Sequence, residues 1–157
     1  MSDAIVVDAS IALKWIFNED YSDGARSLLR HTLAQGHELV APAIFLSEVT
    51  NAVFQHERLG LITAKESDLA IASLLANPVE VLSPPTLYGD ALELARQHGL
   101  RATYDSQYLA LAVSLDAEFW TADDRLFDAL PRSLGWVRRI ADYRVPRALR
   151  KTSLLLK

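Results

Sequence analysis

Four acidic residues stand where carboxylates could meet around a divalent cation. Asp8 ends a short apolar run, Asp123 follows another, Asp105 begins an apolar helical stretch, and Glu48 lies within one. In open parallel sheets, ligands bind beyond the carboxyl ends of the strands, so Asp8 and Asp123 are expected to share one crevice. Two like charges about 4 Å apart repel by roughly 4 kcal/mol at an effective dielectric constant near 20. If the four acids meet, they therefore need a cation or raised pKa values.

The donor atoms of such a cluster are all oxygens, which favour hard cations such as Mg²⁺ or Mn²⁺ over zinc or copper. A cation of this kind polarises a phosphoryl oxygen and activates water, which is the chemistry of metal-assisted phosphodiester hydrolysis. Three polar side chains are close to these acids in the sequence and could contribute to the same site. Ser10 is two residues beyond Asp8, Asn51 is three residues after Glu48 on one helix face, and Thr121 shares a face with Asp123.

Each acid also has an ordinary structural explanation. Asp8 and Asp105 could each cap a following helix, and Glu48 could be a half-exposed residue of an amphipathic helix. Asp124 is expected as the N-cap or in the first turn of a short helix, where it would not bind the metal directly but could orient the site or the substrate. The three polar side chains are individually more often structural than catalytic. Local sequence leaves open whether the acids converge.

Alternating strands and helices must position these residues. Apolar runs predict strands at 4–8, 39–41, 79–82, 119–121 and 136–140, and helical spacing predicts helices at 24–35, 43–58, 63–77, 86–98, 105–115 and 124–130. Thr63 and Glu66 have the spacing of a capping box. Alternation through short connections predicts an α/β protein, a three-layer α/β/α sandwich around a mostly parallel central sheet.

The composition fits a single globular domain. The 157 residues are half hydrophobic and 23% charged. The chain has no cysteine, which excludes disulfides, thiolate nucleophiles and cysteine zinc sites. No apolar run approaches the roughly 18 to 20 residues of a membrane-spanning helix, and no basic segment precedes a hydrophobic stretch at the N-terminus. We expect a cytoplasmic protein without a membrane partner.

The net charge of −4 is unevenly distributed. Residues 132–157 hold eight basic side chains against Asp142 alone, a charge of +7, while residues 1–131 hold eight basic and 19 acidic side chains, a charge of −11. An acidic body with a basic end suits a carboxylate metal site beside a surface for phosphate, for which Arg138, Arg139 and Arg144 are candidates. A solvated tail is an equal alternative. We expect a domain at 1–145 and a basic extension, helix or tail, at 146–157.

Four stretches of the chain resemble the motifs of the PIN-domain family, in particular the ribonuclease toxins of the VapC type. They are residues 6–10 with 12–15 and 19–20, residues 47–52, residues 104–112 and residues 119–126. They occur in the family's order and spacing, and the resemblance covers residues 4 to about 140. It implies a PIN-like fold with a parallel sheet, an acidic site that binds Mg²⁺ or Mn²⁺, and cleavage of RNA.

The resemblance also implies roles for individual residues and partners. Asp8, Glu48, Asp105 and Asp123 match the metal-site carboxylates, and Ser10, Asn51 and Thr121 match groups that orient the site or the substrate. The doubled Asp123 and Asp124 leave open which of them faces the metal, and Asp123 holds the family's position. VapC-type members form homodimers and are inhibited by a VapB-like antitoxin whose C-terminal segment covers the site.

Other functions remain as alternatives. An aspartyl-nucleophile phosphatase of the haloacid-dehalogenase type expects a second acid two residues after Asp8, where this chain has Ser10. A PIN-like domain that only binds RNA or protein stays open. The four histidines show no ligand spacing, and no glycine-rich phosphate loop is present, so we expect no nucleotide cofactor.

Overall fold

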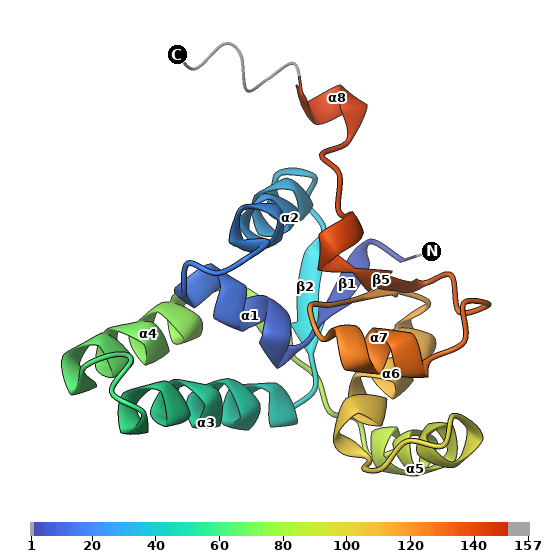
Figure 1. The fold of residues 1–157 in the computed structure, drawn as a ribbon. Coiled ribbons are helices and arrows are strands. Elements are labelled where there is room, and N and C mark those ends of the chain that lie inside the picture. Colours follow the sequence, from blue (N-terminus) through green and yellow to red (C-terminus); the bar gives the residue numbers. More distant parts are fainter. Residues whose placement is uncertain (1, 151–157) are drawn as a thin grey trace.

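A central sheet of five strands organises the computed structural model, which describes residues 2–150 without the side chains of residues 148 and 149 (Figure 1). The strands are β1 (Ala4–Val7), β2 (Glu38–Ala41), β3 (Val79–Val81), β4 (Glu118–Thr121) and β5 (Val137–Arg139). They lie in the order β3-β2-β1-β4-β5, and every neighbouring pair is parallel. The predicted α/β/α sandwich is confirmed, and its sheet is parallel throughout.

Helices connect the strands. They are α1 (Ala9–Ile16), α2 (Ser22–Ala34), α3 (Ile44–Arg58), α4 (Ala64–Ala76), α5 (Leu87–Gln97), α6 (Tyr104–Leu115), α7 (Asp124–Ala129) and α8 (Arg147–Arg150), with a 3₁₀ turn η1 (Ile140–Asp142). From α2 to α7 the predicted ranges agree to within two residues at each end. Helical spacing gave no bounds for α1, because its eight residues span little more than two turns.

The helices cover both faces of the sheet. Neighbouring side chains of a strand point to opposite faces, so Phe119 and Trp120 mark the two sides of β4. On one side Tyr108 of α6 stacks on Phe119, and on the other Trp120 and Leu28 of α2 line the same cavity. Burial on both faces explains why β1, β2 and β4 have nearly continuous apolar sequences.

The strand register places Asp8 beside the end of β4. Val7 is opposite Trp120 and Thr121 is opposite Arg139, so β1, β4 and β5 end together at one edge of the sheet. The order of strands reverses around β1, because β2 and β3 lie on one side of it and β4 and β5 on the other. Ligands of doubly wound sheets bind at such a reversal, beyond the carboxyl ends of the strands.

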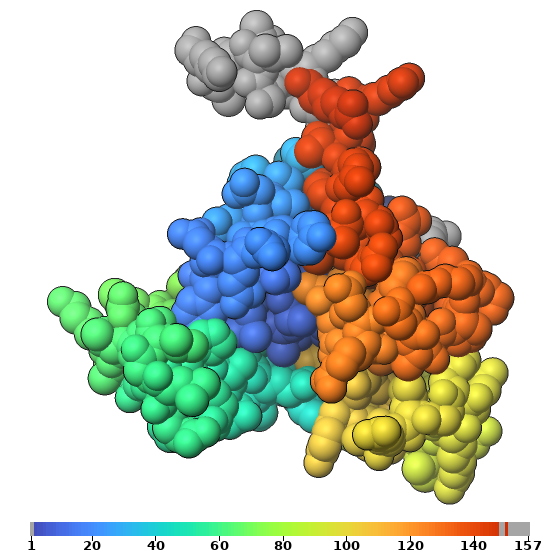
Figure 2. Space-filling model, viewed as in Figure 1, coloured from blue at the N-terminus to red at the C-terminus, as the bar shows by residue number. Residues whose placement is uncertain are grey.

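The C-terminal segment leaves this body. After η1, the chain extends away from the other elements and reaches α8, as Figures 1 and 2 show from one side. Residues 151–157 of the predicted basic extension lie outside the described residues. Within residues 2–150, no helix has the length and apolar character needed to cross a membrane.

Candidate active site

Asp8 lies at the centre of the candidate site. It is 6% exposed, follows β1 with an extended backbone, and is the N-cap of α1. Its Oδ1 accepts hydrogen bonds from the Ile11 backbone N–H (3.2 Å) and from the Ser10 hydroxyl (2.5 Å). Its Oδ2 accepts one from the Thr121 hydroxyl (2.5 Å). Both carboxylate oxygens are therefore held in place by neighbouring elements.

Two hydroxyl side chains connect Asp8 to the turn between β4 and α7. The Ser10 hydroxyl accepts from the Ala122 backbone N–H (2.8 Å), and the Thr121 hydroxyl accepts from the Asp123 backbone N–H (3.0 Å). The two hydroxyl oxygens are 3.3 Å apart. Ser10 and Thr121 thus contact the buried carboxylate, and they fix its position relative to the turn that carries Asp123.

The pKa values show that the four acids influence one another. Burial raises the pKa of Asp8 to about 7, its hydrogen bonds oppose the rise, and the charge of Asp105 adds to it. Burial raises the pKa of Glu48, a hydrogen bond from Tyr108 opposes this, and Asp105 again adds. Burial and then the charge of Asp123 raise the pKa of Asp105. Asp105 therefore interacts electrostatically with each of the other three acids.

The described acids do not surround a single point. Among residues 2–150, no group of three acidic or histidine side chains has the arrangement of a preformed metal site. Proteins usually bind Mg²⁺ through one or two carboxylates and keep several of its waters, so a cage of three or four acids is not required. The oxygen-only donors and their mutual repulsion fit a hard divalent cation.

The helix ends show whether Asp8 and Asp105 cap the helices that follow them. Asp8 does cap α1, so its structural and its functional explanation apply together. Asp105 does not cap α6, because the N-cap is Thr103 and Asp105 lies in the first helical turn. The Asp105 side chain is half-buried, and its carboxylate is available for the cluster.

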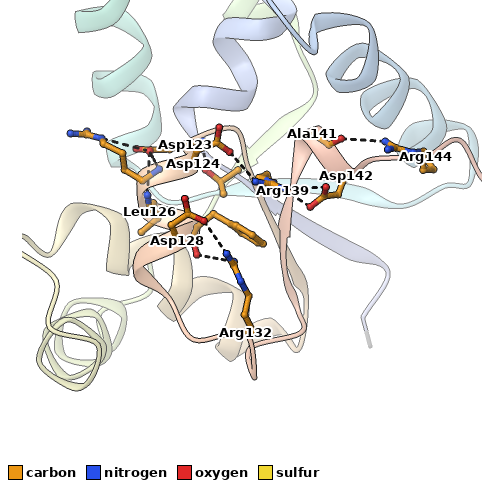
Figure 3. Close-up of polar contacts among 12 residues, drawn as sticks. Asp123, Asp124, Leu126, Asp128, Arg132, Arg139, Ala141, Asp142 and Arg144 are labelled. Atoms are coloured by element: carbon orange, nitrogen blue, oxygen red, sulfur yellow. Dashed lines mark hydrogen bonds and ion pairs between the residues drawn. The ribbon is translucent and has the colours of Figure 1, made fainter.

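The adjacent Asp123 and Asp124 point to different partners, as Figure 3 shows. Asp123 is the N-cap of α7, and its Oδ1 accepts hydrogen bonds from the backbone N–H groups of Arg125 (2.9 Å) and Leu126 (3.2 Å). Asp124 is 62% exposed and forms an ion pair with Arg139 of β5 (3.7 Å). Of the two, only Asp123 raises the pKa of Asp105.

Asn51 differs from its neighbour Glu48 in its surroundings. Its side chain is exposed on α3, where it lines a hollow together with Leu46, Ser47, Thr50 and Phe54. Glu48, one turn earlier, is half-buried and turned toward α6. The two residues share a helix, but their surroundings differ.

Tyr108 belongs to the cluster, although the sequence analysis gave it no role of its own within the apolar helix and the motif at residues 104–112. Its hydroxyl donates a hydrogen bond to Oε1 of Glu48 (2.6 Å), and its side chain is buried. Tyr108 is three residues after Asp105, a spacing that places both on one face of α6. That spacing is the signal that could have indicated it.

The three candidate phosphate-binding arginines all have partners within the chain. Arg138 pairs with Glu118 (3.5 Å), and Arg139 pairs with Asp142 (3.1 Å) as well as Asp124. The Arg144 guanidinium donates to two backbone carbonyls, which Figure 3 shows in part. Arg138 and Arg144 also line a cavity of about 400 Å³ beside α2, which contains none of the four acids.

Comparison with known proteins identifies related sequences and folds. The model of the PIN domain family matches residues 5–132. Ribonuclease VapC3 of Pyrobaculum aerophilum is 30% identical over 129 residues, which cover 81% of this chain and 95% of that protein.

Solved structures share the fold at low sequence identity. The crystal structure of PAE2754 from Pyrobaculum aerophilum has a TM-score of 0.65 at 21% identity and covers 88% of this chain and 84% of its own. VapC20 of Mycobacterium tuberculosis, a sarcin–ricin loop cleaving toxin, has a TM-score of 0.59 at 19% identity, with coverages of 80% and 94%. VapBC2 of Rickettsia felis, bound to a DNA fragment of its promoter, has a TM-score of 0.56 at 18% identity, with coverages of 80% and 92%.

Proposed function

Since the chain belongs to the PIN domain family, we propose that it is an Mg²⁺- or Mn²⁺-dependent endoribonuclease and the toxin of a VapBC-type toxin–antitoxin pair. The observation that carries this proposal is the buried Asp8, which lies at the reversal of strand order and interacts electrostatically with Asp105. The similarity to a VapC ribonuclease over most of both chains supports the same conclusion.

The residues of the proposed site have distinct roles. Asp8, Glu48, Asp105 and Asp123 would hold the cation, which supplies Lewis-acid activation of the phosphodiester and of water when bound. The hydroxyls of Ser10 and Thr121 orient Asp8 through the hydrogen bonds described above. Asp124 neutralises Arg139 and takes no part in binding the metal. Asn51 remains a candidate contact for the substrate from the exposed side of α3.

The proposed partners follow from the same family assignment. A VapB-like antitoxin would inhibit the enzyme, RNA would be its substrate, and two copies of the chain would form a homodimer in the cytoplasm. We assign the nuclease domain to residues 1–145 and treat residues 146–157 as a separate basic extension. This division agrees with the way the segment before α8 leaves the body in Figure 1.

The decisive experiment measures cleavage of RNA by the purified protein. We expect cleavage with Mg²⁺ or Mn²⁺, none with EDTA, and a loss of more than about 100-fold in Asp8→Asn, because a carboxylate at the metal contributes more than its outer partners do. Asp90→Asn on the exposed surface of α5 is a matched control that should cleave normally.

Three outcomes would contradict the proposal. Cleavage that survives both EDTA and Asp8→Asn would mean that another mechanism or another protein is responsible. Wild-type protein that binds RNA but never cleaves it with either metal would favour a PIN-like binding module. Release of phosphate from a monoester, with RNA left intact, would favour a phosphatase that uses Asp8 as its nucleophile.

A further inference from the structure

Tyr108 is a buried polar residue within the acidic cluster. The proposed mechanism gives it no role. Its side chain is 1% exposed, and its hydroxyl donates to Oε1 of Glu48 at 2.6 Å. The two residues are 60 positions apart in the sequence and come from α6 and α3. This hydrogen bond therefore joins two helices at the candidate site.

The phenol has a defined hydrogen-bonding direction. The contact of Tyr108 with Glu48 is the donation of the phenol's own proton to Oε1. One oxygen of Glu48 is thereby occupied, and the other is left for a further ligand.

The ring of Tyr108 has little freedom to move. It stacks on Phe119 of β4 with ring centroids 5.9 Å apart and an angle of 14° between the planes. Phe119 is fully buried in the sheet. A rigid ring fixes the position of the hydroxyl, and through it the position of the otherwise long and flexible Glu48 side chain.

We infer that Tyr108 is a positioning residue of the proposed metal site, which holds Oε1 of Glu48 so that the second carboxylate oxygen faces the cation. This inference rests on the proposed function, because it needs a cation at the acidic cluster. Hydrogen-bond partners of metal ligands typically change metal affinity 10- to 100-fold when they are removed.

The first test is Tyr108→Phe, which removes the hydroxyl and keeps the stacked ring. Binding of Mn²⁺ in the absence of RNA, followed by electron paramagnetic resonance of the free ion, should weaken at least about 10-fold. In cleavage assays the metal concentration for half-maximal activity should rise by a similar factor, while the rate at saturating metal changes less. Tyr88→Phe, an exposed tyrosine of α5, is the matched control and should leave both values unchanged.

A second variant asks whether Tyr108 acts through Glu48. In a Glu48→Gln background, Tyr108→Phe should weaken Mn²⁺ binding by no further factor, because residues that act through one another show non-additive effects. A full additional 10-fold loss in the double variant would mean that Tyr108 acts by another route, and the inference would be wrong.

A fluorine label tests the same contact without removing it, and so remains informative if Tyr108→Phe does not fold. With 3-fluorotyrosine at position 108, the ¹⁹F resonance should shift on addition of Mg²⁺, and Glu48→Gln should abolish the shift. If the wild type binds Mn²⁺ and cleaves RNA but Tyr108→Phe binds Mn²⁺ equally well, the inference fails and the proposed function stands. If the wild type neither binds Mn²⁺ nor cleaves RNA, the proposed function fails, and the inference fails with it.

Discussion

Asp8 shows at the scale of a single residue how a structural and a chemical role can share one carboxylate. It caps α1 and accepts three hydrogen bonds, yet burial still raises its pKa to about 7. The ionised form is therefore costly in the folded protein without a cation. A difference of about three pKa units corresponds to about 4 kcal/mol.

This cost predicts how stability changes with pH. The folded pKa of Asp8 lies above its ordinary value of 3.8, so between these two values the unfolded state has released a proton that the folded state keeps. The protonated Asp8 therefore stabilises the folded state fully below about pH 4. This contribution falls as the pH rises toward 7 and is absent at higher pH. Asp105 and Glu48, whose pKa values are also raised, act in the same direction.

We therefore expect Asp8→Asn to be more stable than the wild type in EDTA at pH 8, because asparagine still caps the helix and carries no charge. Denaturant unfolding at pH 4 and pH 8 checks this, and the gain should be present only at pH 8. Mg²⁺ should stabilise the wild type and leave Asp8→Asn unchanged. A variant that is less stable than the wild type at both pH values would show that hydrogen bonding by Asp8 outweighs its desolvation.

At the scale of elements, the starts of helices determine which side chains reach the site. Asp123, the N-cap of α7, raises the pKa of Asp105, whereas Asp124, the first residue of α7, is turned toward Arg139. The start of α4, the helix that follows α3, is likewise fixed by a cap. The predicted capping box is confirmed: the Thr63 hydroxyl accepts from the Glu66 N–H (3.2 Å), and the Glu66 carboxylate accepts from the Thr63 N–H (2.7 Å).

Removing this cap should affect stability and leave activity intact. Thr63→Ala leaves the first N–H groups of α4 without their side-chain acceptor, so we expect a loss of about 1 kcal/mol in the free energy of unfolding. Denaturant unfolding measures the loss, and Thr63→Ser, which keeps the hydroxyl, is the control. RNA cleavage at 25 °C should match the wild type. A loss of cleavage by the folded variant would mean that α4 contributes to the site.

At the scale of the whole molecule, charge is divided between an acidic body and a basic end. The structure changes what the +7 charge of residues 132–157 implies, since Arg138 and Arg139 are already paired with carboxylates of the chain. Phosphate groups of an RNA would compete with Glu118, Asp124 and Asp142 for these guanidinium groups. The basic end therefore attracts RNA less strongly than its formal charge indicates.

The contribution of this surface can be measured on RNA binding. In an Asp8→Asn background, which prevents cleavage, replacing Arg138, Arg139 and Arg144 by alanine should lower the affinity. The dependence of log K on log salt concentration should become shallower by about 0.7 for each phosphate of a single strand that is no longer neutralised. Arg96→Ala on α5, which removes another exposed and paired arginine, is the control. Unchanged affinity and salt dependence would show that RNA binds elsewhere.

The sequence alone determined the fold class, and it singled out the four acidic positions of the proposed site. Apolar runs and helical spacing are local properties, and they located the strands and α2 to α7 because each element must bury one face. The ends of the apolar runs marked Asp8 and Asp123 as neighbours of strand ends, and acidic side chains in apolar helical stretches marked Glu48 and Asp105. The similarity to PIN-domain motifs then implied a shared role for all four.

Only the tertiary structure decided which side chains touch. The hydrogen bond of Thr121 to Asp8 spans 113 residues and exists because β4 lies next to β1, an order that no local pattern encodes. The pairing of Asp124 with Arg139 and the contact of Tyr108 with Glu48 depend in the same way on how distant elements pack. Residue types fix the available chemistry, while strand order and helix packing fix the partners of each group.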